Sequence, residues 1–190
     1  MESLETNEMM TNEDGWPRRK NIRLQNYDYS MPGDYFVTIV TQGRQCLFGD
    51  IDDDGLRKND ASMLVENCFR ELADNHEGID CLDHVVMPNH FHCILRLRSG
   101  NLSLSQLVRV LKSKTTVGYI QGVRQKGWPP FDGKLWQKGF YEHIIRRERV
   151  FDYIRNYIYR NPERWYYDHL NPNCSSVTDN IIQGIKDLYG

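Results

Sequence analysis

The chain has 190 residues, 39% of them hydrophobic and 26% charged, a composition typical of one globular domain rather than of a disordered or fibrous protein. No stretch approaches the roughly 18 apolar residues that a membrane span needs, and the acidic N-terminus does not resemble a signal peptide. We therefore expect a cytoplasmic protein that does not enter the membrane. Five cysteines without CxxC spacing predict free thiols rather than a disulfide framework or a Cys-rich zinc site.

The net charge of −2 hides an uneven distribution of charge along the chain. Residues 1–16 carry five acidic residues and no basic one, whereas residues 96–160 carry fourteen Lys or Arg against four Asp or Glu. Aromatic residues are interleaved with the basic ones. Such an excess usually marks a solvated face, but its size and its aromatic residues favour binding of a polyanion.

The first half of the chain predicts a tail, a strand and a helix. Residues 1–33 are interpreted as an N-terminal tail or edge segment that ends at a Pro-Gly turn. Residues 35–41 are rich in β-branched and aromatic residues, which is typical of a half-buried strand, and the acidic residues 50–55 are expected to form a loop. Apolar residues at helical spacing predict a helix over residues 60–75.

A hairpin and a second helix follow. Residues 79–87 and 91–98 are strand-like and are separated by the turn dipeptide Pro88-Asn89. Ser103 and Gln106 have the spacing of a capping box, so a helix should begin there, and the apolar stripe that continues it includes Val117.

The last elements complete a recognisable order. Residues 135–145 predict a further strand, and a helix over about 147–161 should end before Pro162. The order strand, helix, strand, strand, helix, strand and then helix is that of the ferredoxin-like split βαβ arrangement. We therefore predict an α+β fold, with an antiparallel sheet, helices on one face and an additional C-terminal helix.

Two histidines in the segment MPNHFHCIL, residues 87–95, form the most specific local pattern. Alternate side chains of a strand share a face, so His90 and His92 project together and can both reach one metal ion, while Cys93 points to the other face. An HxH pair alone is equally compatible with one surface histidine and one histidine in a local hydrogen bond.

The last predicted helix carries a tyrosine at the border of its apolar stripe. Val150, Ile154 and Ile158 form the stripe, and Tyr157 lies beside it with Asn161 one turn further along the same side. Tyr159 falls on roughly the opposite side. A tyrosine at such a border is usually a packing residue.

These segments together resemble a known family. MPNHFHCIL, a basic helix, LWQKGFYEHIIR and a helix ending in NYIYRNP, preceded by YDYSMPGDYFVTIVT, are similar to the HUH transposases with a single catalytic tyrosine, and most of all to the REP-associated tyrosine transposases. The resemblance covers about residues 27–165 and implies a catalytic domain over 34–165 with a C-terminal extension over 166–190.

The resemblance implies roles for four residues. His90 and His92 would hold a divalent metal, Mg²⁺ or Mn²⁺, Asn161 would be its third ligand, and Tyr157 would attack DNA to form a phosphotyrosine. Such an activity implies single-stranded or hairpin DNA as partner, a nucleoid-associated location, and a monomer or a homodimer. Hydrolysis would instead need a positioned water and usually a carboxylate base, and the HUH segment has none, which favours tyrosine as nucleophile.

The basic half of the chain would then bind the DNA. The expected phosphate contacts are Lys112, Lys114, Arg146, Arg147 and Arg149. Aromatic candidates for stacking on unpaired bases are Trp128, Phe131, Trp136 and Tyr141. Two other classes of function stay open: a non-catalytic nucleic-acid-binding protein on the same scaffold, and a zinc hydrolase that uses His90, His92 and a remote histidine such as His143.

Overall fold

The structure is a computed structural model that describes residues 28–99, 102–174 and 181–189. Residues 1–27, most of the predicted N-terminal tail, lie outside the described residues. The main sheet has four strands: β1 (Gly33–Val40), β4 (Ile79–Met87), β5 (His90–Leu97) and β6 (Tyr141–Ile145). The helices are α1 (Asp60–Asn75), α2 (Leu104–Lys126), α3 (Glu148–Arg160) and α4 (Ile181–Asp187).

The sheet is antiparallel throughout, in the order β4-β5-β1-β6. β1 is therefore central, with β5 on one side and β6 on the other, while β4 and β5 form the predicted hairpin. This is the strand order of the split βαβ arrangement, so the predicted fold class is confirmed. The described residues also include two short helical turns, η1 (Gln42–Arg44) and η2 (Pro162–Tyr167).

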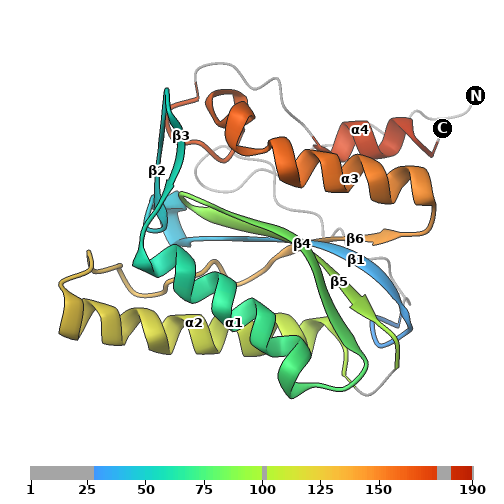
Figure 1. Ribbon diagram of the computed structural model, residues 1–190, viewed down its shortest axis with the longest axis horizontal. Helices are drawn as coiled ribbons and strands as arrows, with labels where there is room; N and C mark the ends of the chain where they lie inside the picture. Colours follow the sequence, from blue (N-terminus) through green and yellow to red (C-terminus); the bar gives the residue numbers. More distant parts are fainter. Residues whose placement is uncertain (1–27, 100–101, 175–180, 190) are drawn as a thin grey trace, which may run out of the picture.

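Helices cover both faces of the sheet (Figure 1). α1 and α2 lie on one face and bury side chains such as Phe69 and Leu111 against Phe91, Cys93 and their neighbours in β1 and β5. α3 and α4 lie on the other face. The predicted stripe of α3 is buried there, because the alternation of strand residues brings Phe36 and Ile94 to this side.

Helix starts follow the local sequence. Ser103 caps α2, its hydroxyl accepting from the Gln106 backbone N–H while the Gln106 side chain accepts from the Ser103 backbone, so the predicted capping box is confirmed. Val117, expected in the apolar stripe of α2, is instead exposed.

No helix in the described part of the chain is long and apolar enough to cross a membrane. All five cysteines are free thiols.

The acidic segment expected to be a loop is a second, two-stranded sheet. β2 (Gly49–Asp52) pairs with β3 (Gly55–Lys58) across a tight turn. Gly49 and Gly55 both have positive φ, at 129° and 107°, which a residue with a side chain rarely adopts. The acidic side chains at the turn masked the strand signal, since aspartate is depleted in strands.

Candidate active site

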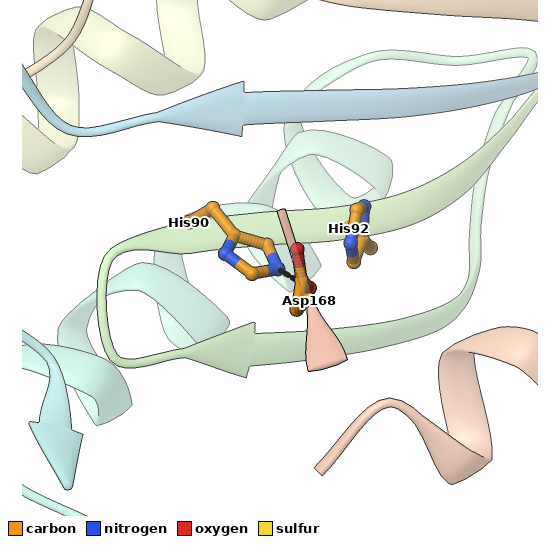
Figure 2. Close-up of side chains that lie close together, drawn as sticks. All are labelled: His90, His92 and Asp168. Atoms are coloured by element: carbon orange, nitrogen blue, oxygen red, sulfur yellow. Dashed lines mark ion pairs between the residues drawn. The ribbon is translucent and has the colours of Figure 1, made fainter. Parts of the chain in front are cut away.

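His90 and His92 lie together on the α3 face of the sheet, near the start of β5 (Figure 2). Their ring centroids are 4.5 Å apart, as expected for alternate residues of one strand. Both side chains are buried, with exposed fractions of 0% for His90 and 2% for His92. The pair is therefore enclosed by the protein, not part of a solvated surface.

Each ring is held through its Nδ1 atom by a buried polar side chain. His90 Nδ1 lies 2.8 Å from Asn89 Oδ1, and His92 Nδ1 lies 2.7 Å from Thr38 Oγ1. The Nε2 atoms of both rings are buried and have no hydrogen-bond partner among the described residues. An imidazole bound through Nδ1 presents Nε2 to a metal ion in many metal sites.

A third group converges on the same point. Asp168 follows η2, is 2% exposed, and places Oδ2 at 3.7 Å from His90 Nε2. Its Oδ1 accepts a hydrogen bond from the Leu170 backbone N–H at 2.7 Å, while Oδ2 has no hydrogen-bond partner within the described residues. One ligand atom from each of the three residues lies within 4.8 Å of the others. Buried ligand atoms that converge on one point and lack hydrogen-bond partners fit a metal ion.

Asp168 was missed in the sequence because it belongs to no periodic pattern or motif. It falls in the predicted extension beyond residue 165, far along the chain from the two histidines. Its presence also corrects one inference from the sequence: the HUH segment contains no carboxylate, but the fold brings one to it.

Asn161, the ligand implied by the family resemblance, is also buried beside the cluster. It ends α3, its side chain is 0% exposed, and neither amide atom has a hydrogen-bond partner among the described residues. Burial lowers the pKa of His90 to about 4, and the nearby Asp168 carboxylate and Asn161 side chain offset part of that effect. Burial, together with His90, holds the pKa of His92 well below its usual value. Both rings are therefore neutral at physiological pH, the form that binds metals.

Tyr157 projects from α3 toward the histidines. Its ring centroid lies 5.3 Å from that of His92, edge to face, and 6.3 Å from that of Phe36, which stacks on His92. The side chain is 5% exposed, whereas Tyr159 is 81% exposed. The helical spacing thus separated the two tyrosines correctly, and the structure brings Tyr157 next to the histidine pair.

Comparisons with known proteins identify the family of the chain. Residues 35–161 match the model of a family described as "Transposase IS200 like". The chain belongs to this family, the single-tyrosine (Y1) transposases. It is 31% identical over 170 residues to an uncharacterised protein of Haemophilus influenzae, a match that covers 82% of this chain and 94% of the relative. It is 33% identical over 78 residues, 41% of each chain, to a REP-associated tyrosine transposase of Escherichia coli.

The fold is likewise that of a Y1 transposase. A solved structure of a REP-associated tyrosine transposase bound to a REP hairpin superposes with a TM-score of 0.53 at 21% identity, covering 83% of this chain and 94% of that one. At this identity the likeness concerns the fold alone. Membership of the family supports a transposase-like function.

The predicted phosphate contacts lie in two separate parts of the fold, in α2 and around the start of α3. Lys112 and Lys114 belong to α2, on the opposite face of the sheet from the histidines. Lys112 donates to the backbone carbonyls of Gln137 and Gly139. Lys114 forms an ion pair with Glu71. The three arginines lie at the start of α3. Arg147 and Arg149 both donate to the carbonyl of Leu188.

The start of α3 also borders a cavity of about 440 Å³, which Arg146 and Arg147 line together with Arg96. Arg96 is already engaged in this cavity, because its guanidinium pairs with Asp34. Phe151 of α3 also lines the cavity, and Tyr157 of the same helix contacts His92, so the cavity lies on the same side of the sheet as the histidines. The predicted roles of these lysines and arginines in DNA binding stay predictions.

The aromatic residues expected to stack on bases are mostly packing residues. Trp136 is buried, and its indole N–H donates to Thr115 Oγ1, so it is part of the core and unavailable to a base. Trp128 and Phe131 pack edge to face against Tyr119. Tyr141 is half-buried on the α3 side, where burial raises its pKa to about 12.

His143 does not complete a three-imidazole site. It lies on β6, paired in register with Phe36 of β1, and it is not in the convergent group found among the described residues. The structure brings the Asp168 carboxylate to the two histidines in place of a third imidazole. The zinc-hydrolase hypothesis loses the histidine on which it depended.

Proposed function

We propose that this protein is a metal-dependent endonuclease and strand transferase that acts on single-stranded DNA bearing a hairpin, through a covalent bond to Tyr157. The observation that carries the proposal is the juxtaposition described above: three buried, unpartnered donor atoms of His90, His92 and Asp168 beside the ring of Tyr157. Neither a packing tyrosine nor a pair of structural histidines accounts for all of these features together.

The residues present fit a divalent metal. His90, His92 and Asp168 would hold it, with Asn161 as a further candidate ligand. Two imidazoles and a carboxylate suit Mn²⁺ better than Mg²⁺, which prefers oxygen ligands alone. When bound, such an ion polarises the scissile phosphate and stabilises the charge that develops on it.

Tyr157 would supply the nucleophile. Its phenol oxygen forms a new bond to phosphorus as it loses its proton, the bond from phosphorus to the 3′ oxygen breaks, and that oxygen takes up a proton to leave as a 3′-hydroxyl. The phosphodiester is conserved as a phosphotyrosine, so the reverse attack by a 3′-hydroxyl rejoins DNA without ATP. Packing against Phe36 and His92 fixes the phenol in one place.

Hairpin DNA is the proposed partner on two grounds. The solved relative is bound to a REP hairpin, and residues 96–160 carry an excess of ten positive charges. A chain that neutralises several phosphates should lose affinity steeply as salt rises. Within the basic half, Arg149 lies in the first turn of the helix of Tyr157, and Arg146 and Arg147 directly precede that helix. These arginines are therefore better placed than the lysines of α2 to meet the same strand.

Asp168 gives hydrolysis a specific observation in its favour. A carboxylate beside a metal site is able to accept a proton from an attacking water. The two chemistries leave different products, since water yields a free 5′-phosphate and tyrosine yields protein-bound DNA. The experiment that tests the proposal must therefore identify the product and not merely detect cleavage.

The test is incubation of the full chain with hairpin-bearing single-stranded DNA and Mn²⁺, followed by mass spectrometry of the protein. We expect a mass increase equal to the downstream fragment, located on Tyr157. Tyr157→Phe should abolish the adduct while binding is retained, and Tyr159→Phe is the matched control because that ring is exposed on the other side of the same helix. Cleavage to a free 5′-phosphate in both variants would establish hydrolysis. Binding without cleavage in any divalent ion would support the non-catalytic alternative.

A further inference from the structure

Asn89, in the turn between β4 and β5, uses every polar group of its buried side chain. Its Nδ2 donates to the backbone carbonyl of Leu170 at 2.7 Å and to that of Arg44 at 3.0 Å. Its Oδ1 lies 2.8 Å from His90 Nδ1. The residue is 0% exposed, so no water competes for these bonds. One side chain thus contacts a histidine of the site and two separate stretches of backbone.

These contacts fix the tautomer of His90. The amide nitrogen has two donors, and each faces a carbonyl that only accepts, so the amide cannot be turned around. The atom that meets His90 is therefore the amide oxygen, also an acceptor, and Nδ1 of the neutral ring must carry the proton. Nε2 is left with a lone pair, directed to the side where Asp168 Oδ2 lies 3.7 Å away.

The same amide also holds the segment that carries Asp168. The carbonyl of Leu170 accepts from Asn89, and the backbone N–H of Leu170 donates to Asp168 Oδ1 at 2.7 Å. Arg44, whose carbonyl is the other acceptor, donates from its guanidinium to the carbonyl of His169 at 2.9 Å. Asn89 of the β4–β5 turn and Arg44 of η1 therefore hold the short turn after η2 in place.

We infer that Asn89 is a positioning residue that assembles the metal site from its two halves: it orients His90 on the sheet and docks the turn that brings Asp168 to it. The inference rests on the metal site of the proposed function. It explains how a carboxylate far along the chain from the histidines reaches them, and it assigns a task to the residue immediately before the HUH segment.

Thr38 provides the matched control. It holds His92 through one hydrogen bond of 2.7 Å, as Asn89 holds His90, and it is also buried. None of the hydrogen bonds described for the turn at Asp168 involves Thr38. Thr38→Val therefore removes a partner of a site histidine without undocking that turn, whereas Asn89→Ala removes both functions.

The experiment uses the full chain labelled with ¹⁵N and freed of metal. Long-range ¹H–¹⁵N spectra report the tautomer of His90, hydrogen exchange reports the protection of the Leu170 amide, and electron paramagnetic resonance reports the Kd for Mn²⁺. We expect the wild-type His90 to be protonated on Nδ1. Asn89→Ala should mix the tautomers, speed exchange at Leu170, and weaken Mn²⁺ binding about 10- to 100-fold, the usual range when a side chain that orients a metal-binding histidine is removed. Thr38→Val should leave the exchange at Leu170 unchanged.

A wild-type His90 protonated on Nε2 would overturn the inference, whether or not any variant folds. So would an Asn89→Ala variant with an unchanged tautomer and unchanged exchange at Leu170. Failure of the wild-type protein to bind Mn²⁺ would refute the metal centre of the proposed function. The tautomer and exchange measurements would still decide whether Asn89 orients His90 and docks the turn.

Discussion

Acidification should destabilise the metal-free protein through His90. The ring is fully buried, which lowers its pKa from 6.5 in the unfolded chain to about 4 in the folded protein. Between these values the unfolded state binds a proton that the folded state does not, so the free energy of unfolding falls as the pH drops through this window. The full difference corresponds to roughly 3 kcal/mol, of which about 2 kcal/mol is lost between about pH 7.5 and about pH 5.

Urea unfolding in EDTA at these two pH values measures the effect, with His90→Gln as the comparison. The variant lacks the titrating ring, so its loss of stability on acidification should be smaller than that of the wild type by about 2 kcal/mol. His92, whose pKa is shifted in the same direction, contributes to both proteins. An equal loss in both would show that His90 does not titrate with a depressed pKa, and the account of the buried pair would be refuted.

Two further predictions concern the third ligand and the packing of α2. Asp168→Asn keeps the shape of the side chain but removes its charge, and we expect calorimetry to show Mn²⁺ binding weakened at least about tenfold; a smaller loss than that of Asn161→Ala would transfer the role to Asn161. A Cβ at Gly122 would overlap the ring of Trp128, whereas one at Gly139 would meet nothing within 4 Å. Gly122→Ala should therefore cost about 1–3 kcal/mol of unfolding free energy, with Gly139→Ala nearly neutral, and equal stability of the two variants would contradict the packing described.

Local patterns predicted the main elements because the same residues decide both local structure and burial. The stripe of Val150, Ile154 and Ile158 placed α3 and the side on which Tyr157 lies, and the capping box placed the start of α2. The hairpin β2–β3 was not predicted because each of its strands has only four residues and because β2 and the turn after it are rich in aspartate. In that hairpin, cross-strand pairing and two glycines with positive φ prevail over the low strand propensity of aspartate.

Local patterns likewise predicted some residues of the candidate site and missed others. His90 and His92 were predictable because strand alternation fixes their common face, and Tyr157 because helix periodicity fixes its side. Trp136 was misjudged because a tryptophan in a basic segment gives no local sign that its N–H will be satisfied by Thr115 in the core. Asp168 gave no local sign either, since its burial depends on hydrogen bonds between its turn and residues far away in the chain.

The buried polar atoms of the site favour a role in metal binding over a role in packing. A buried polar atom without a partner costs about 1–3 kcal/mol, and His90 Nε2, His92 Nε2 and Asp168 Oδ2 are three such atoms gathered within the described residues. Asn89 and Thr38 orient the two rings through their Nδ1 atoms. The Nε2 atoms of both rings have no hydrogen-bond partner among the described residues. A packing core would not retain three convergent lone-pair atoms without a hydrogen-bond donor or a cation between them. A single divalent cation would satisfy all three at once, and His90, His92 and Asp168 would hold it near the ring of Tyr157.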